Sequence, residues 1–116
     1  MNILEIIKKI SFFNHLNNDQ IDLIISISRV AKHHKKSILY HENFTNKNLL
    51  FLVKGLVEIY KIDKFNNKVF LYYINENSMI TELSSIKNNR IINCFSNVRF
   101  LEDSIVLYID SEKFQE

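Results

Sequence analysis

Hydrophobic positions at the start of the chain recur with the spacing of an α-helix. Ile3, Ile6, Ile7 and Ile10 stand at positions i, i+3, i+4 and i+7. This spacing places their side chains on one face and predicts an amphipathic helix over residues 2–10.

A second helix is predicted to begin after Asn17-Asn18-Asp19-Gln20, which resembles a capping box. In that motif an asparagine cap is followed three residues later by glutamine. Ile21, Ile24 and Ile25 then lie on one face, and the helical pattern ends near Arg29.

From Val30 onward, apolar residues alternate with polar ones or form short runs, and both patterns are typical of β-strands. Even spacing of short strands, with no helix long enough for a crossover, predicts an antiparallel sandwich or barrel. The stretch TELSSI interrupts the pattern, because its Glu and Ser residues disfavour a strand, and predicts a short helix near 82–87. The predicted strands are Ser37–Glu42, Leu49–Val53, Leu56–Ile62, Val69–Ile74, Ile91–Val98 and Ile105–Ile109.

Gly55 lies between two of the apolar runs and is the only glycine in the chain, which has no proline. A glycine between two strands usually supplies a positive φ, a bulge or a close backbone contact. The residue therefore predicts a structural turn. Asparagine pairs at 17–18, 66–67 and 88–89 can supply other turns, because asparagine tolerates the left-handed region.

Length and composition favour one globular domain, since the 116 residues are 47% apolar. A net charge of +2 gives no electrostatic signature of a nucleic-acid-binding surface, and the basic run Lys32–Lys36 is typical of a solvated strand end. The single cysteine, Cys94, excludes an internal disulfide and a cysteine-ligated iron–sulfur cluster. Charged residues interrupt the apolar N-terminus, so we predict neither signal peptide nor membrane span, and a cytoplasmic protein.

Five stretches resemble, in the same order, the effector-sensing domain of CRP/FNR transcription regulators. That domain is the cyclic-nucleotide-binding jelly roll, and the resemblance covers nearly the whole chain. One stretch, Leu50–Tyr60, is similar to the family pattern l-y-f-v-l-s-G-x-v-x-v-y and contains Gly55. The other four are Phe13–Ile21, Lys36–Asn43, Ile80–Leu83 and Leu101–Asp110.

The resemblance implies a mainly β fold with flanking helices. We expect a double-stranded β-helix, or jelly roll, of about eight strands with two N-terminal helices and the short helix near 82–87. Residues 1–116 would then be a sensor domain whose function is to bind an effector and regulate transcription. In the family, a dimerisation helix and a winged helix-turn-helix DNA-binding domain follow. Both are absent here, although Ser111–Phe114 resembles the start of the helix. The chain is then either a sensor fragment of a regulator that is a homodimer, which we favour, or a naturally solitary domain.

The resemblance also locates a candidate ligand pocket. Family members that bind cyclic nucleotides hold the ribose with a glutamate, matched by Glu82, and the phosphate with an arginine. Cys94-Phe95 stands at the Arg-Ser position, and a buried phosphate without a cationic partner loses its main charge-assisted hydrogen bonds. We therefore expect no cyclic AMP binding of the usual kind. The candidate pocket residues are Ile80, Thr81, Glu82, Leu83, Cys94 and Phe95.

Glu82 and Cys94 also have structural interpretations, and several family glycines are replaced in this chain. Glu82 could equally be a helix-start carboxylate satisfied by backbone N–H groups, and Cys94 a small core residue rather than a redox-sensing thiol. Family glycines fall at Lys36, Asn43, Asn77 and Thr81. Because lysine and threonine adopt a positive φ only at a cost, we expect differently shaped turns at Lys36 and Thr81.

Two further functions remain open. Some family members sense gases such as nitric oxide through haem, and His15 or His41 could be an axial ligand. Surface positions are the commoner place for lone histidines, and His33 and His34 would point to opposite faces of a strand. The jelly roll is also the fold of cupin metalloenzymes, but the histidines do not form a metal motif. No nucleophile–base pair or paired carboxylates are recognisable, so we predict no enzyme and no metal site.

Overall fold

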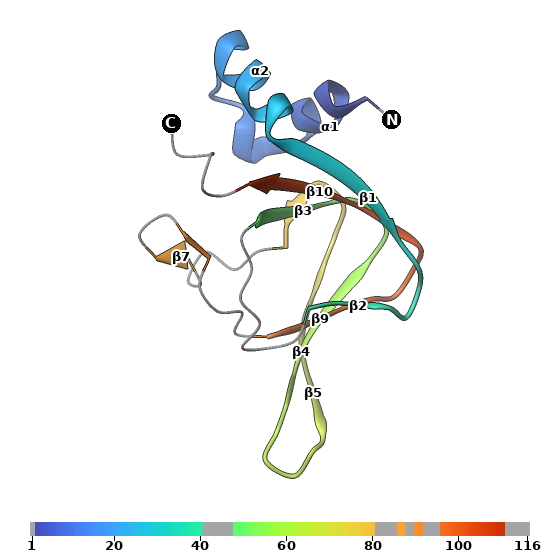
Figure 1. Ribbon diagram of the computed structural model, residues 1–116. Coiled ribbons are helices and arrows are strands. Elements are labelled where there is room, and N and C mark those ends of the chain that lie inside the picture. Colours follow the sequence, from blue (N-terminus) through green and yellow to red (C-terminus); the bar gives the residue numbers. More distant parts are fainter. Residues whose placement is uncertain (1, 41–47, 81–85, 88–89, 92–95, 111–116) are drawn as a thin grey trace.

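The computed structural model describes residues 2–40, 48–80, 86–87, 90–91 and 96–110. Within these ranges the chain forms two α-helices and a 3₁₀ turn, followed by antiparallel strands in three sheets (Figure 1). The elements are α1 (Ile3–Lys9), η1 (Ser11–Phe13), α2 (Asn18–Ser26), β1 (Ser28–His33), β2 (Ile38–Tyr40), β3 (Asn48–Lys54), β4 (Val57–Ile62), β5 (Lys68–Ile74), β6 (Ser78–Met79), β7 (Ile86–Lys87), β8 (Arg90–Ile91), β9 (Asn97–Phe100) and β10 (Ser104–Asp110).

The strands other than β7 and β8 pair in a nested order, from the two ends of the chain inward. β1 pairs with β10, β2 with β9, β3 with β6, and β4 with β5. The result is a first sheet in the order β1-β10-β3-β6 and a second sheet in the order β2-β9-β4-β5. This nesting is the topology of a jelly roll and confirms the predicted fold class.

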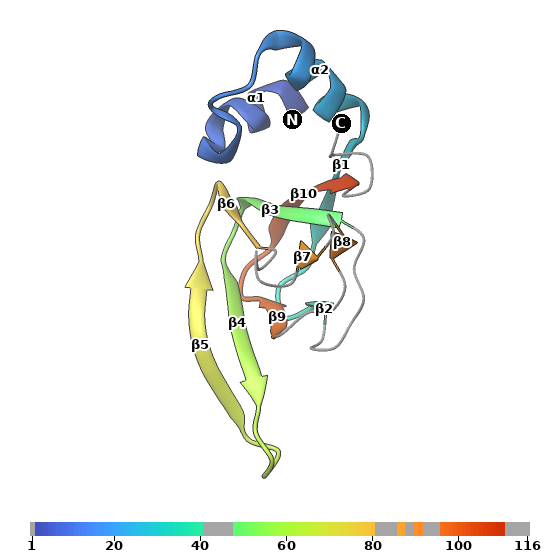
Figure 2. The ribbon, with the colours of Figure 1, turned by 90° about the vertical axis from the view of Figure 1, so that its left-hand side faces the viewer.

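The two N-terminal helices pack on the outer face of the first sheet (Figure 2). Asn17 begins α2 with the predicted capping box, in which its side chain accepts from the Gln20 N–H at 2.9 Å. In β3, Leu49 and Phe51 belong to the cluster under the helices, whereas Leu50 and Leu52 belong to the core between the sheets. The unbroken apolar run of β3 therefore reflects burial on both faces.

The core between the sheets is almost entirely aliphatic and aromatic. Its members come from both sheets, so each sheet contributes one wall. These buried residues are Tyr40, Leu50, Leu52, Val57, Ile59, Ile74, Ile80, Val98, Phe100, Val106 and Tyr108.

Gly55 lies where the chain leaves β3 in the first sheet and enters β4 in the second. Its φ is +112°, a conformation that side-chain-bearing residues rarely adopt. A Cβ at this position would lie 2.7 Å from Cβ and 3.0 Å from Cα of Ser104, besides overlapping its hydroxyl. The Gly55 N–H also donates to Oε2 of Glu76 at 3.1 Å. Both backbone conformation and packing thus require glycine.

The second helix is shorter than the sequence pattern predicts, and it is followed by a strand that the pattern missed. α2 ends at Ser26 rather than near Arg29, and β1 begins at Ser28. β1 pairs along its length with β10, from Ser28 opposite Ile109 to His33 opposite Ser104. Pairing with a strand so distant in sequence outweighs the local helical spacing.

Two further assignments near residue 90 need correction. Ile86–Lys87 is not helical but forms strand β7, because it pairs with Arg90–Ile91 across a two-residue connection. The rest of the helix predicted near 82–87, residues 82–85, lies outside the described residues. The single strand predicted over Ile91–Val98 contributes to two strands, β8 and β9.

The turn at Lys36 keeps the conformation that a glycine would supply, so the prediction of a differently shaped turn was wrong there. Lys36 has φ +74°, and its N–H donates to the Phe100 carbonyl at 2.8 Å. That bond ties the turn to β9 and offsets part of the strain of a left-handed lysine. Asn77 has φ +68°, as the asparagine substitution predicts, whereas Asn43 and Thr81 lie outside the described residues.

Candidate effector site

Ile80 is the one candidate pocket residue within the described part of the chain. It is 1% exposed, belongs to the core between the sheets, and donates its N–H to the Leu50 carbonyl at 2.7 Å. The chain therefore enters the interior directly after edge strand β6. The other five candidates, Thr81, Glu82, Leu83, Cys94 and Phe95, lie outside the described residues.

A second buried anchor lies where β9 begins. Ser96 and Asn97 are 2% and 3% exposed, and Nδ2 of Asn97 donates to the Tyr60 carbonyl at 3.3 Å. Residues 81–95 thus connect a buried position in the first sheet to a buried position in the second. Thr81 and Phe95 adjoin these two anchors in sequence.

The walls next to the anchors carry apolar and aromatic side chains. Tyr40 and Val98 are paired across β2 and β9, and Leu50 belongs to the same core cluster as Ile80. The buried charged residue of the described chain, Glu58, alternates with core residues of β4 and so faces outward, where its carboxylate pairs with Lys68 at 2.5 Å. The described interior can therefore hold an apolar or aromatic group but offers no buried cation.

A cluster of aromatic and basic side chains joins β1 to β10 in the first sheet and to β9 in the second sheet. Nε2 of His33 and the Tyr108 hydroxyl share a hydrogen bond of 2.6 Å, and the His33 ring stacks on Phe100 with centroids 4.6 Å apart. The Arg29 guanidinium lies 3.9 Å from the centroid of the Tyr108 ring. Sequence patterns missed this cluster because β1 was not predicted, although Arg29 and His33 stand at alternate positions in the sequence Arg-Val-Ala-Lys-His.

The environment of the cluster shifts both titratable groups toward their neutral forms. Burial and, to a smaller extent, the Arg29 charge lower the pKa of His33 below its usual value of 6.5. Burial raises the pKa of Tyr108 above its usual value of 10.0, and the Arg29 charge acts in the opposite direction. At neutral pH the pair is an uncharged link between β1 and β10.

The His33 environment predicts a loss of stability in mild acid. Because the folded-state pKa lies below the unfolded value of 6.5, the unfolded chain binds a proton first as the pH falls. The free energy of unfolding should therefore decrease from about pH 6.5 downward until the folded-state pKa is reached. Urea unfolding at a series of pH values measures this decrease.

Two substitutions separate His33 from other titrating groups. His33→Gln should flatten the profile between about pH 5 and 7, whereas the same change at the exposed His34 should leave it sloped. An unchanged slope in His33→Gln would contradict the assignment.

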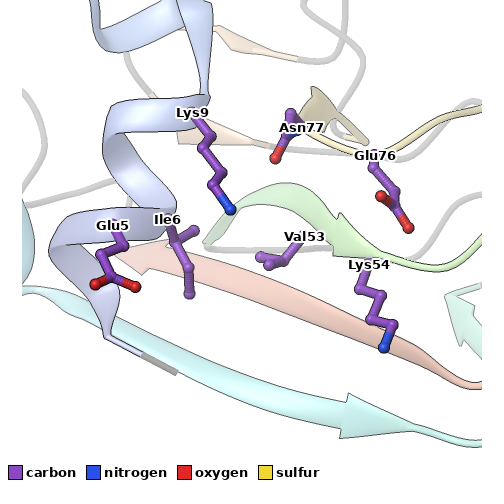
Figure 3. Close-up of a pocket in the computed structure, with 7 residues that line it drawn as sticks. All are labelled: Glu5, Ile6, Lys9, Val53, Lys54, Glu76 and Asn77. Carbon is purple, nitrogen blue, oxygen red and sulfur yellow. The ribbon is translucent and has the colours of Figure 1, made fainter.

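Two small surface cavities lie on the outer side of the first sheet. One, of about 280 Å³, is bounded by α1, the end of β3 and the β5–β6 turn; Figure 3 shows Lys9 and Glu5 on α1 across from Lys54 and Glu76. The other, of about 240 Å³, lies between Lys32 and Asp103 at the ends of β1 and β10. Neither is lined by a candidate pocket residue.

The described residues contain no group of three or more His, Cys, Asp or Glu side chains placed to hold a metal ion. His15 and His34 are exposed and His33 is engaged with Tyr108, while His41 lies outside the described ranges. None of the described helices has the length and apolar character needed to cross a membrane.

Comparison with solved structures shows the same fold in several regulatory proteins. The sensor domain of the transcriptional regulator DNR from Pseudomonas aeruginosa superposes with a TM-score of 0.83 at 14% identity, covering 97% of this chain and 73% of that one. A cyclic nucleotide-binding protein described as putative, from Geobacter metallireducens, gives 0.80 at 22% identity, with coverages of 97% and 79%. The regulatory domain of Toxoplasma gondii PKA, solved with cAMP, gives 0.81 at 14%, with coverages of 96% and 41%.

Several of the similar structures are longer than this chain. In a second crystal structure of DNR from Pseudomonas aeruginosa, this chain covers 48% of the DNR chain. No curated protein sequence matches the chain significantly. The family model for the cyclic nucleotide-binding domain matches residues 30–116. The chain belongs to the cyclic nucleotide-binding domain family, and its fold is that of the sensing domains of CRP/FNR-type transcription regulators.

Proposed function

We propose that this chain is the effector-sensing domain of a CRP/FNR-type transcription regulator that does not bind cyclic AMP in the usual way. The family match and the jelly roll support a regulatory sensing domain. The replacement of the phosphate-binding arginine by Cys94-Phe95 supports a different effector.

The observation that carries this proposal is the absence of a buried cation from the described interior. Its walls are aliphatic and aromatic, from Leu50 and Val98 to Tyr108. Arg29, the cation beside this aromatic cluster, is exposed and lies over the Tyr108 ring. A cyclic phosphate placed between the sheets would lose its hydration without gaining a cationic partner from the described interior.

The effector that suits these walls is a small molecule with an apolar or aromatic body. Ile80, Thr81, Glu82, Leu83, Cys94 and Phe95 remain the residues we propose to line its pocket, with Glu82 available to accept hydrogen bonds from ligand hydroxyl groups. DNA binding and the principal dimer contact belong, in this proposal, to a C-terminal part of a cytoplasmic regulator. Among the described residues, no observation favours a haem sensor or a cupin-like metalloenzyme.

The proposal predicts that cyclic AMP does not bind with micromolar affinity. Calorimetric titration of the chain should give no saturable heat, whereas restoring the family residues by Cys94→Arg/Phe95→Ser should create binding. We expect affinity to rise at least about tenfold, since a charge-assisted hydrogen bond contributes about 1.5–3 kcal/mol.

Glu82 provides the control in that background. Cys94→Arg/Phe95→Ser/Glu82→Gln should lose the gained affinity, because the ribose contact implied by the resemblance is then weakened. Micromolar binding of cyclic AMP by the parental chain would overturn the proposal.

A further inference from the structure

The β4–β5 hairpin carries an exposed apolar strand that the sensing role does not explain. β5 is the last strand of the second sheet, and the hairpin projects beyond the rest of the sandwich (Figures 1 and 2). Its residues Val69–Tyr73 are all between 40% and 54% exposed. Solvent-exposed edge strands normally carry charges or proline. In β5 the single charged residue is Lys68, whose ammonium group forms an ion pair with Glu58.

Apolar side chains cover both faces of β5. Phe70 and Tyr73 pair with Tyr60 and Glu58, and their rings lie 4.6 Å apart on one face. Val69 and Ile74 pair with Lys61 and Val57 and therefore point to the opposite face. A partner docked on one face would leave the other exposed, whereas a strand added at the edge lies beside both rows of side chains.

A bulge changes which side chains of β5 share a face of the sheet. The register shift leaves Leu71 as the extra residue between Phe70 and Tyr72, so that Phe70 and Tyr73, three positions apart, share a face. In an antiparallel pair of two copies, Phe70 can lie opposite Tyr73 of the second copy, and Val69 opposite its Ile74. These pairs match face with face and are aromatic or β-branched, the kinds that stabilise antiparallel strands.

We propose that two copies of this chain associate through the outer edges of their β5 strands, joining the two second sheets into one continuous antiparallel sheet. Among the described strands, β4 is the one that pairs with β5. The strand from Val69 to Ile74 carries no charge, so two copies meet without repulsion. The same edge is used by both copies, and such a two-fold contact closes as a dimer.

The exposed area fits a weak dimer. Five side chains at these exposures present on the order of 450 Å² per copy, so about 900 Å² for the pair is the most that they can contribute to the interface. Phe65 at the tip is 73% exposed and adds to this surface. Specific interfaces begin near about 1,000 Å², so we expect association in the micromolar range.

Sedimentation of the full chain over a range of concentrations tests the proposal, with two charge variants. Phe70→Lys/Tyr73→Lys and Phe70→Glu/Tyr73→Glu should each be monomeric, because two copies would oppose like charges. Mixing them should restore a dimer containing one of each, as a self-complementary edge requires. Circular dichroism spectra like that of the parental chain establish that both variants are folded.

Phe65→Lys is the matched control, because it places a charge on the most exposed aromatic residue of the hairpin but outside β5. It should weaken the dimer by less than the paired β5 substitutions, which should weaken it at least about tenfold. A parental chain that stays monomeric at about 100 μM would overturn the proposal, since micromolar association predicts mostly dimer there. So would a mixture of the two charge variants that remains monomeric, or loss of the dimer in Phe65→Lys alone.

Discussion

Replacing Gly55 by valine is expected to lower the free energy of unfolding by about 4 kcal/mol, because backbone strain and overpacking each cost about 1–3 kcal/mol. The φ of +112° lies in a region where a β-branched residue is an outlier. A Cβ would also overlap Ser104, whose Cβ lies 2.7 Å from that position. Denaturant unfolding monitored by circular dichroism measures the loss.

A double-mutant cycle separates the two contributions. Ser104→Gly removes the side chain that a new Cβ would meet, so Gly55→Ala should cost less in that background than in the parental chain. Asn66→Ala is the control for conformation alone, since Asn66 has φ +66° at the exposed hairpin tip, and it should cost about 1 kcal/mol. A Gly55→Val variant within about 1 kcal/mol of the parental chain would show that the turn can rearrange.

Truncating Phe51 to alanine should be of similar severity, with a loss of about 3–5 kcal/mol. Phe51 is fully buried, and its ring lies 5.1 Å from that of Phe13 and 5.7 Å from that of Phe12. The cavity would open between β3 and the helical layer, where η1 is held to the sheet.

Phe65→Ala removes the same side chain from a position that is 73% exposed, and it should change the free energy of unfolding by less than about 0.5 kcal/mol. Thermal and denaturant unfolding of both variants give the comparison. Equal effects at the two positions would contradict the assignment of Phe51 to the packing between helices and sheet.

The elements with a strong local signal were predictable from sequence. The capping box placed the start of α2, and the apolar run over Leu49–Val53 placed β3. Gly55 marked the junction between β3 and β4, but its sequence neighbours did not show that the two strands lie in different sheets. That property depends on the pairing of β3 with β10 and of β4 with β9.

Features set by long-range contacts were not predictable in the same way. β1 is a strand because β10 pairs with it, and Lys36 holds a left-handed conformation in a turn tied to Phe100. The link between His33 and Tyr108 joins residues 75 positions apart. For the candidate pocket, sequence motifs selected Ile80 and residues of the segment between the two buried anchors, Ile80 and Ser96. The identity of the effector depends on the shape of the pocket, which motifs do not encode.

The position of β10 has a consequence for how the chain folds. This strand lies between β1 and β3 in the first sheet, and its Leu107 and Ile109 also pack beneath the helices. During synthesis the N-terminal helices emerge long before the surface that covers them can form. Nearly all of the domain must therefore leave the ribosome before its two hydrophobic layers close, and we expect slow, all-or-none folding dominated by contacts of high sequence separation.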